Sequence, residues 1–165
     1  MEIQISTADW NAAEAQWLIV AIPEEPSLSG RFEQLDAAMG GTLSRLIEME
    51  DLTGKLAKSL PIRDAQGIAA TRLLVTGLGD LDELTRPRLE KALTAAARKV
   101  ATKKDVTAAI AIPESLGGGL TVAQAVETAA IALHVGSQGQ DGLKAEPGRH
   151  PLAAATILVD PADEA

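Results

Sequence analysis

Apolar residues along the chain gather in short runs that predict the strands of a sheet. Residues 17–22 and 73–75 are continuously apolar, which is typical of strands covered on both faces. Residues 2–6 alternate between polar and apolar side chains, the pattern of a half-buried strand. Pro61 marks an irregular strand at an edge or a bulge. The predicted strands are residues 2–6, 17–22, 55–63, 67–76, 106–112 and 153–159.

Between these runs, apolar residues three and four positions apart predict amphipathic helices. Ser29 is placed to cap the first helix, and Thr121 with Gln124 forms a capping box before the last. Residues 136–151 hold four glycines and two prolines, which predict a long loop. The predicted helices start at Gly30, Thr42, Thr85 and Thr121. The clearest apolar face belongs to the third helix, with Leu89, Leu93, Ala96, Ala97 and Val100.

The order of the predicted elements is typical of an α/β domain with a mixed sheet of about six strands flanked by helices. Its later half reads strand–helix–strand–helix–strand, so neighbouring strands there are expected to be parallel. We expect one domain over residues 1–160. Residues 161–165 are expected to form a polar tail or the start of a linker.

Composition narrows the classes of function. The 165 residues carry a formal net charge of −8, which argues against a general binder of nucleic acids or acidic membranes. Trp10, Trp17 and Phe32 are the whole aromatic inventory, which disfavours binding by stacking of bases. The absence of cysteine excludes disulfides and thiolate metal sites. The start lacks a secretory signal pattern, and no apolar run approaches the roughly 20 residues that span a bilayer, so a cytoplasmic location is expected.

Two glycine-rich turns are candidates for binding an anion. Gly77–Gly79 follows a buried strand as in dinucleotide-binding turns, but Asp82 stands where the third glycine of that fingerprint belongs. Because acidic side chains there would repel phosphate, we interpret this turn as structural. Gly117, Gly118 and Gly119 precede a capped helix, whose backbone N–H groups and dipole favour an anion. No Lys or Arg lies nearby in sequence, and a flexible connection explains these glycines equally well.

Seven of the fifteen basic residues lie close together in sequence, and two interpretations are open for them. One is a patch for nucleic acid or an acidic partner, and the other is a solvated helix face whose terminal cations suit the helix dipole. These residues are Arg86, Arg88, Lys91, Arg98, Lys99, Lys103 and Lys104. His134 and His150 lack spaced carboxylate partners of the kind that metal and catalytic sites need. The residues alone therefore predict no catalytic, metal-binding or cofactor-binding residue.

Three motifs, taken in order, resemble one known family. They are the pattern L-D-x-x-x-G-G-x-L-S at Leu35–Ser44, the pair Gly54-Lys55, and Val75–Gly79 before an alanine-rich helix. Together they are similar to the N-terminal domain of the leucyl aminopeptidases, the cytosol aminopeptidase family of two-metal exopeptidases. The resemblance runs from about Ile3 to Val159. The segment after Glu127-Thr128 departs from the family, because it lacks the aromatic residues that similar proteins have there.

The resemblance implies a macro-domain-like three-layer fold and a non-catalytic accessory role. In these hydrolases a separate C-terminal domain holds two divalent cations, zinc or manganese, and its signatures do not occur in this chain. The chain alone is therefore expected to have no peptidase activity. The implied partners are the catalytic domain of the same polypeptide and the other subunits of a hexamer. Two alternatives follow from the same observations: a stand-alone macro-like module for ADP-ribose or a related nucleotide, and DNA binding through the basic helix at residues 86–104.

Overall fold

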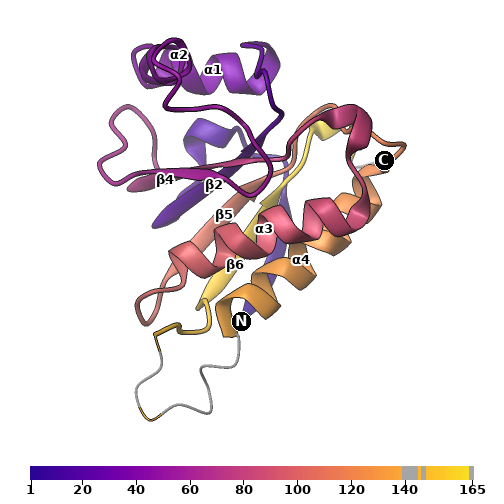
Figure 1. The fold of residues 1–165 in the computed structure, drawn as a ribbon. Coiled ribbons are helices and arrows are strands. Elements are labelled where there is room, and N and C mark those ends of the chain that lie inside the picture. The colour runs from indigo at the N-terminus through magenta and orange to yellow at the C-terminus, as the bar shows by residue number, and fades with distance from the viewer. Residues whose placement is uncertain (139–144, 146–147, 164–165) are drawn as a thin grey trace.

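In the computed structural model, which describes residues 1–138, 145 and 148–163, six strands form one mixed sheet in the order β1-β6-β5-β2-β4-β3 (Figure 1). The strands are β1 (Glu2–Ser6), β2 (Trp17–Ile22), β3 (Ser59–Ile62), β4 (Arg72–Gly77), β5 (Thr107–Ala111) and β6 (Ala154–Leu158). The helices are α1 (Gly30–Ala38), α2 (Thr42–Glu48), α3 (Arg86–Val100) and α4 (Val122–Gln138), with the 3-10 turns η1 (Trp10–Ala12), η2 (Leu81–Glu83) and η4 (Pro161–Asp163). The predicted α/β class is confirmed. Among the described helices, none combines the length and hydropathy that a bilayer crossing requires.

The strand directions follow the sequence signals. β1, β6, β5, β2 and β4 are parallel to their neighbours, whereas β3 runs antiparallel to β4 at the edge of the sheet. Pro61 of β3 pairs with Leu74 of β4 and is exposed. Proline has no backbone N–H to donate to a further strand, so the edge is the position it tolerates. The predicted edge position is confirmed.

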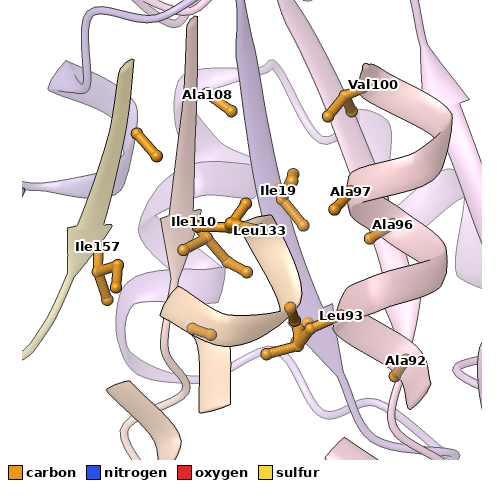
Figure 2. Close-up of a cluster of buried hydrophobic side chains, with 14 of the residues drawn as sticks. Ile19, Ala92, Leu93, Ala96, Ala97, Val100, Ala108, Ile110, Leu133 and Ile157 are labelled. Carbon is orange, nitrogen blue, oxygen red and sulfur yellow. The ribbon is translucent and has the colours of Figure 1, made fainter. Parts of the chain in front are cut away.

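The side chains of β2 alternate between two cores, which explains why the whole strand is apolar. Leu18, Val20 and Ile22 join the cluster under α1, α2 and η1. Trp17, Ile19 and Ala21 join the cluster under α3 and α4. Figure 2 shows the second cluster, in which Leu93, Ala96, Ala97 and Val100 of α3 face the strands beside Ile19 and Ile110. The chain thus forms three layers, with α1 and α2 on one face of the sheet and α3 and α4 on the other.

α3 and α4 lie side by side, and a glycine lets them approach closely (Figure 1). A Cβ added at Gly136 would lie 2.6 Å from the Cβ of Ala97 and 2.8 Å from the carbonyl oxygen of Thr94. The prediction that a loop begins at residue 136 is therefore wrong. α4 continues to Gln138, and Gly136 allows it to approach α3 closely. The remainder of the predicted loop at residues 139–144 and 146–147 lies outside the described residues.

β1 is the other edge strand, and it is more exposed than its alternating pattern predicts. Ile3 is 37% exposed and Ile5 is 61% exposed, so the prediction of a half-buried strand is wrong. Both residues lie in register with Ala155 and Ile157 of β6, which face the α3 and α4 core. The helices of that face pack on β2, β4 and β6. The apolar side of β1 therefore extends past the part of the sheet that helices cover.

Candidate functional site

The topology of the sheet points to one location for a site, at the carboxyl ends of β2 and β5. These neighbouring parallel strands lead to opposite faces, β2 to α1 and β5 to α4. Ligands of open α/β sheets bind at such a switch point, in the crevice outside the strand ends. A cavity of about 260 Å³ lies there, between Ala21–Phe32 and Pro113–Ser115. We call this cavity the β2–β5 crevice.

Arg31 is the buried cation of the β2–β5 crevice. It stands in the first turn of α1 and is 8% exposed. Its Nη1 donates to the carbonyl oxygen of Val159 at 3.2 Å. Its Nε lies 3.9 Å from Oε1 of Glu114 and 3.8 Å from Oδ2 of Asp160, which are ion-pair distances longer than a hydrogen bond. α1, the turn after β5 and the end of β6 therefore meet at the guanidinium group of Arg31.

Glu114 also caps α1. The backbone N–H of Arg31 donates to Oε1 of Glu114 at 3.0 Å. Ser29 occupies the predicted N-cap position, but its side chain makes no capping hydrogen bond. Gly30 has φ of +56°, and a Cβ there would lie 2.3 Å from Oε2 of Glu114. The missing side chain at residue 30 thus leaves the space that the carboxylate occupies.

The lining of the β2–β5 crevice is mixed: three serines stand in it beside Arg31 and Glu114, and its apolar residues include an aromatic ring. Pro23, Pro26, Phe32 and Pro113 line it together with Trp10. Trp10 is buried, and within the described residues its indole Nε1–H has no hydrogen-bond partner. Sequence reasoning missed this site. An arginine directly before the buried Phe32 was the local signal, but nothing in the sequence pairs it with Glu114.

The Gly77–Gly79 turn is a packed corner, as predicted. A Cβ at Gly77 would lie 2.0 Å from the carbonyl oxygen of Lys55. Gly79 has φ of +75°, and its N–H donates to the carbonyl oxygen of Gly54 at 3.0 Å. The chain of residues 54–58 thus lies against this corner, and Asp80 Oδ1 accepts from the N–H of Asp82 at 2.9 Å.

Gly117, Gly118 and Gly119 lie in the connection before α4, and two of them pack against η2 and the residue that follows it. A Cβ at Gly117 would lie 1.9 Å from the carbonyl oxygen of Leu81, and one at Gly118 would lie 1.8 Å from that of Leu84. The predicted capping box is confirmed. The N–H of Gln124 donates to Thr121 Oγ1 at 3.2 Å, and the N–H of Thr121 donates to Gln124 Oε1 at 3.1 Å. The anion site at these glycines stays a prediction.

The seven basic residues are spread along α3 and the turn that follows it. Arg86 pairs with Glu127 at 3.0 Å and Arg88 pairs with Glu83 at 2.9 Å, near the start of the helix. Lys91 and Arg98 lie on an open groove of about 540 Å³ along α3. Lys99, Lys103 and Lys104 are exposed at the end of α3 and after it. Their role as a binding patch stays a prediction.

The two histidines lie in different surroundings. His134 is exposed on α4 and its Nδ1 lies 3.4 Å from Nε2 of Gln138. The backbone N–H of His150 donates to the carbonyl oxygen of Ala101 at 2.8 Å. Within the part of the chain that the structure describes, no group of three or more His, Cys, Asp or Glu side chains could hold a metal ion.

Comparison with known proteins gives a consistent family and fold. The model of the cytosol aminopeptidase family, N-terminal domain, matches residues 19–147. Probable cytosol aminopeptidases of Burkholderia cenocepacia and Burkholderia ambifaria are each 30% identical over 99% of the chain, and the chain covers 35% of their length. It thus spans about a third of these relatives.

Solved structures add the likeness of fold. A tomato leucine aminopeptidase mutant superposes with a TM-score of 0.76 at 21% identity, covering 96% of this chain and 32% of that one. A macrodomain mutant of Oceanobacillus iheyensis superposes with a TM-score of 0.67 at 13% identity, covering 96% of this chain and 81% of that one. The predicted macro-domain-like architecture is confirmed.

Proposed function

The chain belongs to the cytosol aminopeptidase family as its N-terminal domain, the family that its motifs predict, and we propose that it packs as a non-catalytic accessory domain on a catalytic domain of the same polypeptide. The observation that carries this proposal is the family match over residues 19–147. Because the chain covers 35% of the relatives it matches, those relatives have room for a second, catalytic unit. In this proposal residues 1–160 are the accessory domain and residues 161–165 are its polar tail or the start of a linker.

The proposed parent is a cytoplasmic, hexameric hydrolase that removes N-terminal residues from peptides. Its two divalent cations, zinc or manganese, would supply an activated water and stabilise the developing charge. The residues of this chain do not fit that metal pair, since no metal-holding group occurs among the described residues. We therefore assign no step of the reaction to this chain. The name of these relatives, probable cytosol aminopeptidase, supports the reaction class.

Exposed apolar side chains support the proposed packing role. Ile3 and Ile5 stand on an edge strand, where unpaired backbone groups and apolar side chains favour a partner. Ile131 and Val135 of α4 are 40% and 46% exposed on the same side of the sheet. Covering such surface with another domain removes apolar area from water, worth about 25 cal/mol per Å².

The alternative of a nucleotide-binding module depended on the macro-like fold and on Gly117, Gly118 and Gly119. The likeness to a macrodomain mutant of Oceanobacillus iheyensis, at 13% identity, and to a macrodomain of Mycobacterium tuberculosis, at 12% identity, is a likeness of fold alone. It adds no residue of a nucleotide site. The accessory-domain role is the one that both the family match and the fold support.

Two measurements test the proposal. The purified chain, assayed on a peptide with N-terminal leucine in the presence of Mn²⁺ or Zn²⁺, is expected to show no turnover. Clear turnover would contradict a non-catalytic role. The second measurement uses a chimera in which this chain replaces the matching third of the Burkholderia cenocepacia relative.

In that chimera, Ile5→Lys is expected to reduce assembly in sedimentation velocity and to reduce peptidase activity, because it puts a charge in the proposed contact. Met49→Lys is the matched control, since Met49 is 63% exposed but lies at the end of α2 on the opposite face. Equal assembly and activity of the two variants would contradict packing through β1.

A further inference from the structure

We propose that the β2–β5 crevice binds a free α-amino acid with an apolar side chain. This binding site is independent of the packing role proposed above, and either can fail without the other. The assignment depends on a buried cation with unused donors, a neighbouring carboxylate, apolar side chains in the lining and a small volume.

Arg31 is suited to hold the carboxylate of such a ligand. A guanidinium group carries five N–H donors in a planar fork that matches a carboxylate. Among the described residues its one hydrogen bond goes to the carbonyl oxygen of Val159, and the two carboxylates stand 3.9 and 3.8 Å from its Nε. Burial of a cation is unfavourable unless it is paired and hydrogen-bonded. A ligand carboxylate in the crevice would accept from guanidinium N–H groups that make no hydrogen bond to the described residues.

Glu114 is suited to hold the ammonium group. Glu114 lines the crevice, and its side chain is 42% exposed. The backbone N–H of Arg31 donates to its carboxylate, which occupies the room left by the missing side chain of Gly30. Together with Asp160, it gives the site two negative charges for one positive charge. A zwitterion matches this mixture of signs. A polyphosphate would meet repulsion from both carboxylates, so the charges favour an amino acid over a nucleotide.

The walls and volume fit a single apolar side chain. Pro23, Pro26, Phe32 and Pro113 offer a rigid apolar surface. The volume of about 260 Å³ lies below the range of about 300–1,000 Å³ typical of pockets for larger ligands. Ser29 also lines the crevice, and its hydroxyl is not used to cap α1. The lining therefore offers a ligand apolar rings together with charged groups and the hydroxyls of Ser27, Ser29 and Ser115.

The two tryptophans of the chain provide a paired probe. Trp10 lines the crevice, whereas Trp17 stands at the start of β2, with Arg72 at 5.6 Å from its ring. In a proton–nitrogen correlation spectrum of the labelled chain, L-leucine is expected to shift the Trp10 indole signal in a saturable way and to leave Trp17 unchanged. At about 10 mM ligand, a Kd of about 1 mM gives roughly 90% occupancy.

Ligand analogues separate the two charged contacts. Leucinamide lacks the carboxylate and 4-methylpentanoate lacks the ammonium group, and each is expected to bind at least about tenfold more weakly than leucine, the scale of one hydrogen bond to a charged group. Glycine, which lacks the apolar side chain, is expected to bind more weakly as well. Equal binding of leucine and leucinamide would overturn the proposal and would instead point to a peptide N-terminus.

Variants locate the binding in the crevice. Arg31→Met and Glu114→Gln are each expected to weaken leucine binding by about tenfold or more. Arg63→Met is the matched control, because Arg63 is exposed next to β3, and it is expected to bind leucine like the parent. If Arg31→Met does not fold, the Glu114→Gln variant and the ligand analogues measured on the unchanged chain still test whether leucine binds in the crevice. No Trp10 shift with leucine at about 10 mM, or a Trp10 shift with ADP-ribose in place of leucine, would refute the assignment.

Discussion

Gly118 and Gly119 form a matched pair that isolates the energetic cost of a steric contact at residue 118. Both have left-handed backbone, with φ of +66° and +71°. A Cβ at Gly118 would lie 1.8 Å from the carbonyl oxygen of Leu84, whereas one at Gly119 would meet nothing within 4 Å. An alanine at either position thus shares the same backbone strain. The alanine at residue 118 must also displace the backbone of the segment at Leu84.

The magnitudes can be worked out for each variant. Left-handed backbone costs a non-glycine residue about 1–2 kcal/mol, and alanine returns about 0.4–1 kcal/mol by restricting the unfolded chain. Gly119→Ala is therefore expected to lower the free energy of unfolding by about 0–1.6 kcal/mol. Overpacking adds about 1–3 kcal/mol at Gly118, so Gly118→Ala should be less stable than Gly119→Ala by that amount.

Urea denaturation followed by tryptophan fluorescence measures both free energies of unfolding. The same difference is expected to appear in thermal unfolding, at about 2–4 °C in Tm for each kcal/mol in a chain of this size. Because the strain and unfolded-state terms are common to both variants, the difference reports the contact with Leu84. Equal destabilisation of the two variants, within about 0.5 kcal/mol, would refute the close packing of Gly118 against Leu84.

Three further predictions concern the helices. Leu93→Ala, at a side chain that is 1% exposed in the core beneath α3, is expected to lower the free energy of unfolding by about 2–5 kcal/mol in urea; a loss below about 1 kcal/mol would show that this core is loosely packed. Thr121→Ala removes half of the capping box and is expected to cost about 0.5–2 kcal/mol in the same assay, and an unchanged midpoint would contradict the cap. Glu127→Gln breaks the exposed pair with Arg86 and is expected to cost less than about 1 kcal/mol at low salt and nothing measurable near 1 M salt; a large effect that salt does not reduce would argue for a buried pair.

Local signals were enough to predict most of the fold. The continuous apolar run of β2 follows from its position between two cores, and the helical spacing of Leu89 to Val100 follows from its single buried face. The predicted edge position of Pro61 depends only on its missing N–H. In each case the physical cause acts within a few residues of the signal.

The β2–β5 crevice could not be predicted in this way, because its parts meet only in the folded chain. Arg31 lies 83 residues from Glu114 and 128 residues from Val159. The expected cap from Ser29 was displaced by a carboxylate from another loop. Gly136 was likewise predicted to lie in a loop. It is instead a helical residue that packs against α3, and this contact is not visible in the local sequence.

The pairing of the first strand with the last has a consequence for synthesis of the protein. Glu2 lies in register with Ala154, so β1 finds its hydrogen-bonding neighbour about 150 residues later in the chain. At about 5–20 residues per second, the ribosome takes roughly 8–30 s to make that distance. Throughout this interval Ile3 and Ile5 belong to an unpaired segment, whereas β2 pairs with β4 as soon as residue 77 has been made. β1 therefore stays without its hydrogen-bonding neighbour until β6 has been made, and β6 then completes the sheet by joining β1 to β5.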